Sequence, residues 1–303
     1  MPTASGPAEA AVAAAREAGF EAADAEVVNV GTHVLVRMGE IAARVTGEGP
    51  LASFAGDLAA ELRVAAFLRD AGAPVLPPVH DTVLEHGGRR VTLWRWWAVR
   101  REDTPAEIGH ALAECHRALA GAGGAEGSAS GGAKSRAGGA GPPASGGAAS
   151  RAGGAEGSAG GGVAGLGLRP WAKLSEARER CTDARLLRFL GPPDVPLVPV
   201  HGDAHAGNVL PGPVWHDWED AQLGCVEWDL ACLVAPGRVV GGDFGYGEEI
   251  LAGYDAPCDP VLLDTCVAKR TAQQAVYGLL LGDTIPGLPE RVAARLEWLS
   301  RWQ

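Results

Sequence analysis

The chain has 303 residues, 47% of them hydrophobic, and a formal net charge of −11 at pH 7. This length and hydrophobic share suffice for a sizeable core, while the acidic balance argues against a protein that binds a nucleic-acid backbone. Six cysteines occur without any CxxC spacing, so zinc ribbons and thioredoxin-like sites are not expected.

The N-terminal third of the chain predicts an antiparallel sheet with one internal helix. Residues 1–20 lack the basic start of a signal peptide and indicate an amphipathic helix. Helical spacing of apolar residues over 57–71 predicts a second helix, with Asp57 as its N-cap and Gly72 just past its end. We therefore expect residues 1–97 to form one lobe. Alternation of apolar residues predicts its strands at 27–30, 33–38, 41–46, 79–84 and 90–96.

A segment of unusual composition, 121–162, follows. It consists almost entirely of Gly, Ala, Ser and Pro, and AGGAEGSA occurs in it at 122–129 and again at 152–159. Such a sequence lacks the apolar surface needed to offset the entropy lost on ordering. We expect a disordered insertion.

The part of the chain from 98 to 303 predicts a mainly α-helical lobe that carries this insertion. A short hairpin is expected from 208–210 and 214–218, with its turn at Pro211-Gly212-Pro213. The predicted fold class is α+β: a small antiparallel β N-lobe with one key helix and a mainly α C-lobe, with a ligand site between them. The predicted helices of the C-lobe are 105–119, 171–190, 260–281 and 289–302.

The segment HGDAHAGNVL, 201–210, is rich in catalytically useful side chains. Its Asp203 and Asn208 have the Asp-x-x-x-x-Asn spacing of base and metal ligand in the catalytic loop of protein kinases. There the aspartate orients the attacking hydroxyl, and the asparagine reaches a metal ion on the phosphates. The alternative is a purely structural loop.

The next segment, VWHDWED at 214–220, favours the catalytic interpretation. It places Asp217 at the end of an apolar strand directly after the hairpin, where kinases carry a second Mg²⁺-chelating aspartate. Mg²⁺ prefers oxygen ligands and keeps several waters, so Asn208 and Asp217 would suffice as protein ligands. On a continued strand Glu219 would share the face of Asp217, whereas Asp220 is expected to be solvated.

The histidines of this region permit another hypothesis. His201, His205 and His216 are compatible with a zinc hydrolase, but neither HxHxDH nor HExxH occurs. A His201 held by hydrogen bonds to the loop backbone is the simpler interpretation.

The N-lobe contains a cation and a carboxylate that correspond in order to a conserved pair of protein kinases. Arg44 lies on a predicted strand and Glu61 on the helix that follows, in the order of the kinase Lys–Glu pair. The alternative is a surface arginine and a solvated glutamate. Gly31, in NVGTHVLVRMG, would lie over the phosphates, although the segment is not a GxGxxG.

Together these segments resemble the aminoglycoside phosphotransferase family of small-molecule kinases, also called the phosphotransferase enzyme family. The resemblance rests on HGDAHAGNVL, WHDWEDAQLGCVEWDLA, AELRVAAFLRDAG, VTLWRWW and ALAECHRAL, which occur in the family's order. It implies a protein-kinase-like bilobal fold and transfer of the γ-phosphoryl group of ATP or GTP to a hydroxyl.

The resemblance also implies roles for the motif residues. Asp203 would be the catalytic base, and Asn208 and Asp217 the Mg²⁺ ligands. Arg44, which replaces the usual strand lysine, would contact the phosphates and be oriented by Glu61.

Other family positions fall on residues that would bind the base or support the loop. His201 and Asp229 would brace the catalytic loop. The hinge strand next to the nucleotide base would include Trp94, Arg95, Trp96 and Trp97.

We therefore expect a cytoplasmic Mg²⁺- and ATP- (or GTP-) dependent kinase that phosphorylates a small hydroxylated molecule, such as an aminoglycoside or another antibiotic. A nucleotide-binding pseudokinase is the alternative, followed by the metallohydrolase. The acidic balance argues against a nucleic-acid partner. No membrane partner is expected, because no apolar run approaches the ~20 residues of a membrane span. Candidates for contacting the acceptor are His205, Asp243, Glu248 and Glu249.

Overall fold

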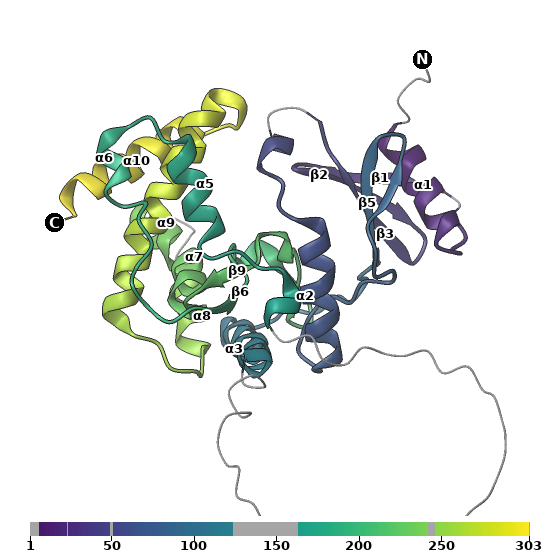
Figure 1. Ribbon diagram of the computed structural model, residues 1–303, viewed down its shortest axis with the longest axis horizontal. Helices are drawn as coiled ribbons and strands as arrows, with labels where there is room; N and C mark the ends of the chain where they lie inside the picture. Colours follow the sequence, from purple (N-terminus) through teal and green to yellow (C-terminus); the bar gives the residue numbers. More distant parts are fainter. Residues whose placement is uncertain (1–5, 23, 49–50, 124–162, 242–245, 303) are drawn as a thin grey trace, which may run out of the picture.

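The computed structural model describes residues 6–22, 24–48, 51–123, 163–241 and 246–302. Most of the predicted insertion, 124–162, lies outside these residues, as does Asp243. Within them the chain forms a small β-sheet lobe and a larger helical lobe, as the sequence predicts (Figure 1). The helix α2 (Leu58–Asp70) lies between the two.

The N-lobe sheet has the strand order β1-β2-β3-β5-β4, and every neighbouring pair is antiparallel. Because side chains alternate across a strand, β3 directs Ala43 and Val45 into the core on one face and Ala42 and Arg44 into the interlobe cleft on the other. The strands are β1 (Glu26–Val30), β2 (His33–Met38), β3 (Ile41–Thr46), β4 (Leu84–His86) and β5 (Arg89–Arg95).

The two N-lobe helices confirm the sequence pattern. α1 (Pro7–Glu17) buries Ala10 and Ala14 against the outer face of the sheet, where small side chains permit close approach. α2 begins after Asp57, whose carboxylate accepts hydrogen bonds from the Ala59 and Ala60 amides at 2.9 and 3.2 Å. This N-cap satisfies two amides that have no partner within the helix.

The strand predicted at 79–84 is wrong. Only Leu84–His86 form β4, which pairs with β5 through the turn at Gly87 and Gly88, both at positive φ. The tight turn places the residues just before it opposite β5. Upstream, pairing with β5 is limited to an isolated bridge between Pro78 and Trp94, where the Val79 amide donates to the Leu93 carbonyl at 3.0 Å.

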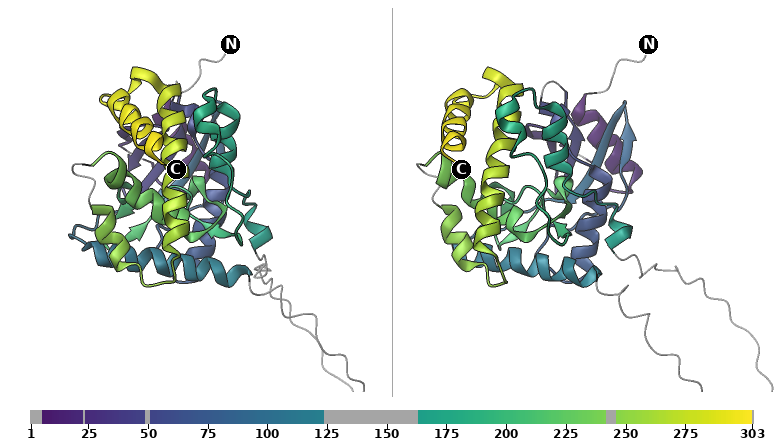
Figure 2. Two further views of the ribbon diagram at one scale, coloured as in Figure 1. Left: turned by 90° about the vertical axis from the view of Figure 1, so that its left-hand side faces the viewer. Right: turned by 60° about the vertical axis from the view of Figure 1, so that its left-hand side comes forward.

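The C-lobe consists of helices around two short strand pairs. β6 (Val198–Val200) pairs with β9 (Gln222–Gly224), and β7 (Val209–Leu210) with β8 (Val214–Trp215), the predicted hairpin. Figure 2 shows α9 running nearly the height of the lobe, with α3 crossing near its lower end. The helices are α3 (Pro105–Gly123), α4 (Val163–Leu166), α5 (Ala172–Arg180), α6 (Ala184–Leu187), α7 (Val226–Val239), α8 (Tyr246–Gly253), α9 (Pro260–Leu281) and α10 (Leu288–Arg301).

The C-lobe helices differ from expectation in two respects. The helix predicted at 171–190 is interrupted, because Asp183 caps the new helix α6 by accepting a hydrogen bond from the Arg185 amide at 2.9 Å. The sequence analysis also did not predict α4, α7 or α8. α7 is buried on nearly every side and contains Pro236, so it lacks an amphipathic pattern.

Among the described helices, none has the length and apolarity needed to cross a membrane.

Candidate active site

The loop that follows β6 carries Asp203 and is anchored from below by Asp229 of α7. The Asp229 carboxylate accepts hydrogen bonds from the His201 amide at 2.7 Å and the Gly202 amide at 2.8 Å. Trp228 Nε1 donates to the Gly202 carbonyl at 2.8 Å. Two consecutive residues of α7 therefore hold the backbone immediately before Asp203, an arrangement that suits the bracing role expected of Asp229.

His116 of α3 extends this anchor, and the sequence analysis missed it. Its Nε2 lies 2.9 Å from Asp229 Oδ2, and its Nδ1 lies 2.8 Å from the Tyr254 hydroxyl. All three side chains are buried. The signal was available: a histidine at a core-facing position of the predicted helix ALAECHRAL requires a polar partner in the core.

The side chain of Asp203 lies between two basic side chains, those of Arg270 and His205. Its Oδ1 forms an ion pair with Arg270 of α9, and its Oδ2 lies 3.7 Å from His205 Nε2. Burial favours the neutral carboxyl, but Arg270, with His205 and His201, outweighs it and holds the pKa of Asp203 below its ordinary value. Asp203 is therefore ionised at neutral pH, with one oxygen available to a ligand.

Asn208 closes the loop. Its Nδ2 donates to the Asp203 backbone carbonyl at 2.9 Å, and the side chain is buried. The amide group is thus fixed, with its oxygen as the remaining acceptor.

Asp217 follows β8 at a sharp change of direction. Its φ is +68°, in the left-handed region that is rare for non-glycine residues. The carboxylate lies 2.8 Å from Arg44 Nη2. Burial alone would raise the pKa of Asp217, but Arg44, followed by His216, keeps it below its ordinary value.

Arg44 is shared by three carboxylates. It forms an ion pair with Glu61 of α2, and its Nη2 lies 2.8 Å from Asp217 and 3.2 Å from Glu219. Burial raises the pKa of Glu61 to about 8 although Arg44 acts to lower it, and the same balance raises that of Glu219 to about 8. The predicted Arg44–Glu61 pair therefore forms within a cluster of three carboxyl groups, two of which hold their protons more tightly than a free glutamate.

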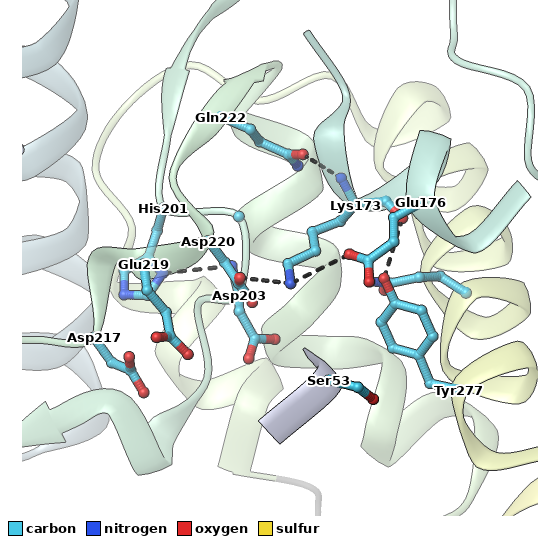
Figure 3. Close-up of polar contacts among 12 residues, drawn as sticks. Ser53, Lys173, Glu176, His201, Asp203, Asp217, Glu219, Asp220, Gln222 and Tyr277 are labelled. Carbon is cyan, nitrogen blue, oxygen red and sulfur yellow. Dashed lines mark hydrogen bonds and ion pairs between the residues drawn. The ribbon is translucent and has the colours of Figure 1, made fainter. Parts of the chain in front are cut away.

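The structure corrects two expectations for the segment after Asp217. The segment Trp218–Asp220 forms a 3-10 helix rather than a strand, and Glu219 faces Arg44. Asp220 is not solvated: its carboxylate lies 2.6 Å from Lys173 Nζ of α5 (Figure 3). Burial raises the pKa of Asp220 to about 6, against the opposing effect of Lys173.

Two cavities flank these residues. The first, of about 290 Å³, lies between the lobes and is lined by Arg44 and Asp217. Its far wall is the end of β5, where the Trp96 amide donates to the Glu40 carbonyl at 2.8 Å and Trp97 Nε1 donates to the Pro211 carbonyl at 2.7 Å. Other predicted nucleotide-binding residues that line it are Gly31, Glu61, Trp94, Arg95, Trp96 and Trp97.

The second cavity, of about 460 Å³, lies within the C-lobe and is lined by Asp203 and His205. The predicted acceptor residues Glu248 and Glu249 do not line it: both are exposed on α8, and Glu248 Oε1 lies 2.6 Å from Arg238 Nε. Asp243 lies outside the described residues. The sequence analysis missed Arg270, although an arginine within a largely apolar helix such as α9 indicates a buried partner.

The histidines have other partners. His201 Nε2 donates to the His216 carbonyl at 2.9 Å, and His205 Nδ1 accepts from the Gly207 amide at 3.0 Å. Among the described residues, no group of three or more His, Cys, Asp or Glu side chains has the arrangement of a metal cluster. The geometry does not support a histidine-based hydrolase.

Comparison with known proteins identifies the family of this chain. A model of the phosphotransferase enzyme family matches residues 23–261, which contain the sheet, the Asp203 loop and Asp217. The chain belongs to the phosphotransferase enzyme family. No curated protein matches its sequence closely enough to be counted as a relative.

Solved structures share the fold of this phosphotransferase at low identity. A choline/ethanolamine kinase family protein from Mesorhizobium loti is 16% identical, with TM-score 0.54 over 92% of this chain and 87% of that chain. The choline kinase LicA from Streptococcus pneumoniae is 12% identical, with TM-score 0.56 over 96% and 98%. A spectinomycin phosphotransferase solved with ADP and spectinomycin is 13% identical, with TM-score 0.52 over 94% and 91%. These likenesses show a kinase-like fold.

Proposed function

We propose that this protein is a Mg²⁺-dependent kinase that transfers the γ-phosphoryl group of ATP or GTP to a hydroxyl of a small molecule. One observation carries the proposal: Asp217 lines the interlobe cavity, and Asp203 lines the second cavity, within the C-lobe. The two segments are joined where His201 Nε2 donates to the His216 carbonyl. A phosphate donor and an acceptor bound in the two cavities would meet at this junction.

The interlobe cavity is assigned to the nucleotide. The backbone of Trp94–Trp97 would meet the base, and Gly31 would lie above the phosphates. Arg44 would contact the phosphates, with Glu61 holding the guanidinium in place. The ADP found in the spectinomycin phosphotransferase supports nucleotide binding by this fold.

The donor set near Asp217 suits Mg²⁺. Three carboxyl groups converge on a single arginine, and among them Asp217 is the one whose pKa stays below its ordinary value, so it is ionised at neutral pH. Mg²⁺ is commonly held by one or two carboxylates together with substrate phosphates. Asp217 and Asn208 would hold the ion, which would supply charge stabilisation for the phosphates being transferred.

Asp203 would accept a hydrogen bond from the acceptor hydroxyl and aim its oxygen at the γ-phosphorus. In the transfer, the hydroxyl oxygen of the acceptor bonds to the γ-phosphorus. The bond between the γ-phosphorus and the oxygen that bridges it to the β-phosphate breaks. The nucleoside diphosphate leaves, and the hydroxyl proton passes to Asp203 and then to water. Because Arg270 lowers the pKa of Asp203, we assign Asp203 mainly to orientation, which matters most when the transition state is loose.

The test measures ATP consumption with Mg²⁺ across hydroxylated acceptors that include aminoglycosides, other antibiotics, sugars and amino alcohols, with mass spectrometry for the added phosphate. We expect a phosphorylated product that Asp203→Ala reduces by about 10²–10⁴-fold, with nucleotide affinity nearly unchanged. Nucleotide binding without transfer to any acceptor would favour the pseudokinase. A protein that binds no nucleotide would refute the proposal.

A further inference from the structure

The cavity beside Asp203 has an excess of positive charge, although the whole chain is acidic. Two arginines, Arg270 and Arg295, line it against the single carboxylate of Asp203. The remaining described lining is apolar or uncharged, apart from His205. Burial lowers the pKa of His205, so this side chain adds little charge at neutral pH.

The two arginines differ in their partners. Arg270 forms an ion pair with Asp203, and its Nη1 donates to Gln273 Oε1 at 2.6 Å. Arg295 of α10 has a buried Nη1 without a hydrogen-bond partner among the described residues. Burial, followed by the like charges of Arg270 and Arg291, lowers the pKa of Arg295 to about 10. Arg295 remains protonated at neutral pH.

Arg295 is only partly exposed, and its buried Nη1 has lost water without gaining a partner, which is costly for a cationic donor. An anionic oxygen in the cavity would both satisfy Arg295 Nη1 and balance its charge. A guanidinium also suits carboxylate and phosphate groups, which it binds through paired hydrogen bonds. A polyamine would instead add positive charge to a cavity that already has an excess.

We propose that the acceptor is a small hydroxylated anion, whose carboxylate or phosphate group pairs with Arg295 while its hydroxyl meets Asp203. This inference rests on the proposed kinase function, because it assigns the second cavity to the acceptor. Thr271 and Gln274, which also line the cavity, offer hydrogen bonds to further hydroxyls.

The first experiment compares acceptors that differ in one anionic group: serine with ethanolamine, glycerate with glycerol, and glucose 6-phosphate with glucose. We expect kcat/KM to be higher for the anionic member of at least one pair. The serine and glycerate pairs report on a carboxylate, and the glucose pair on a phosphate. Higher kcat/KM for ethanolamine, glycerol or glucose in every active pair would overturn the inference.

The second experiment measures binding directly and does not depend on turnover. Isothermal titration calorimetry follows serine, glycerate and glucose 6-phosphate binding to the full chain, saturated with Mg²⁺ and a non-hydrolysable ATP analogue. We expect Arg295→Gln to weaken binding of the preferred anion about tenfold to a hundredfold, and Arg295→Lys to restore part of it. Arg301→Gln is the control, since Arg301 lies on the same helix and is exposed.

The outcomes separate the two proposals. Equal anion affinity in Arg295→Gln and Arg301→Gln, or no anion binding to the wild-type chain, would overturn the anionic acceptor. Loss of binding in a folded Arg295→Gln, checked by circular dichroism, would support it. Failure of the nucleotide analogue to bind would instead contradict the kinase function, and anion binding is then measured without nucleotide.

Discussion

At the scale of single residues, Arg44 has the largest number of charged partners in the cleft. Its guanidinium contacts Glu61, Asp217 and Glu219 at once, and a planar group with several donors suits this task. Lysine has a single compact ammonium group and would leave at least one of these buried carboxylates poorly paired.

Arg44→Lys should therefore destabilise the protein by about 1–3 kcal/mol, because hydrogen bonds to charged groups are lost. We also expect weaker nucleotide binding, measured by calorimetry alongside denaturant unfolding. Arg69→Lys on α2 is the matched control, since its ion pair with Asp70 is exposed and contributes little. Equal losses in the two variants would contradict the role of Arg44.

Glu61 predicts a pH dependence of stability. Its pKa is about 8 in the folded protein, against 4.5 for the free side chain. The folded state therefore keeps a proton that the unfolded chain has released, and stability falls as the pH rises from about 4.5 to about 8.

Glu61→Gln should make this decline less steep, by at most about 1.4 kcal/mol per pH unit for one carboxyl group. Denaturant unfolding at pH 5, 6, 7 and 8 measures the slope. Glu85→Gln, at an exposed position of β4, is the control and should match the wild type. If the Glu61→Gln slope equals the wild-type slope, the proton is not held at Glu61.

At the scale of elements, the Asp203 loop depends on a close approach between two backbones. Gly202 has a φ of +87°, and a Cβ at this position would lie 2.0 Å from the Asp220 carbonyl oxygen. The Asp203 loop and the 3-10 helix after Asp217 therefore fit together only with glycine here.

Gly202→Ala should unfold at lower denaturant concentration and lose most of its transferase activity, because the displaced loop carries Asp203. Gly72→Ala is the control: its φ is +74°, but a Cβ there meets nothing within 4 Å. Gly72→Ala should lower the free energy of unfolding only by the strain of a left-handed alanine, about 1–2 kcal/mol. The excess loss in Gly202→Ala measures the close approach, and no excess would contradict it.

At the scale of the whole molecule, the Gly/Ala/Ser segment interrupts the sequence between α3 and α4. α3 ends at Gly123 and α4 begins at Val163, and these two helices contact each other. Because the two helices are in contact, replacing 124–162 by a short Gly/Ser linker tests whether the segment contributes to the fold.

We expect the deletion to leave the unfolding temperature unchanged or slightly higher. Closing a shorter loop loses less entropy, by about 0.6 kcal/mol for each halving of its length. Differential scanning calorimetry and nucleotide titration measure the effect. A large drop in the unfolding temperature would mean that the segment contributes contacts to the fold.

The sequence by itself determined the features whose residues are neighbours along the chain. Asp203, Asn208 and Asp217 lie within one loop and hairpin, so their spacing alone brings them to one place. The same holds for the capped helix α2 and for the alternation that turns Arg44 toward the cleft. Local hydrogen bonding and side-chain periodicity decide these features before any packing forms.

Only the tertiary structure decided which distant residues complete the site. His116, Lys173, Arg270 and Arg295 come from four helices, and helical periodicity does not specify how each helix is rotated against the catalytic loop. α7 could not be predicted from the sequence for a related reason: a helix buried on nearly all sides has no polar face, and so no apolar periodicity. The charge of the second cavity arises from packing α9 and α10 together, so an acidic sequence encloses a basic cavity.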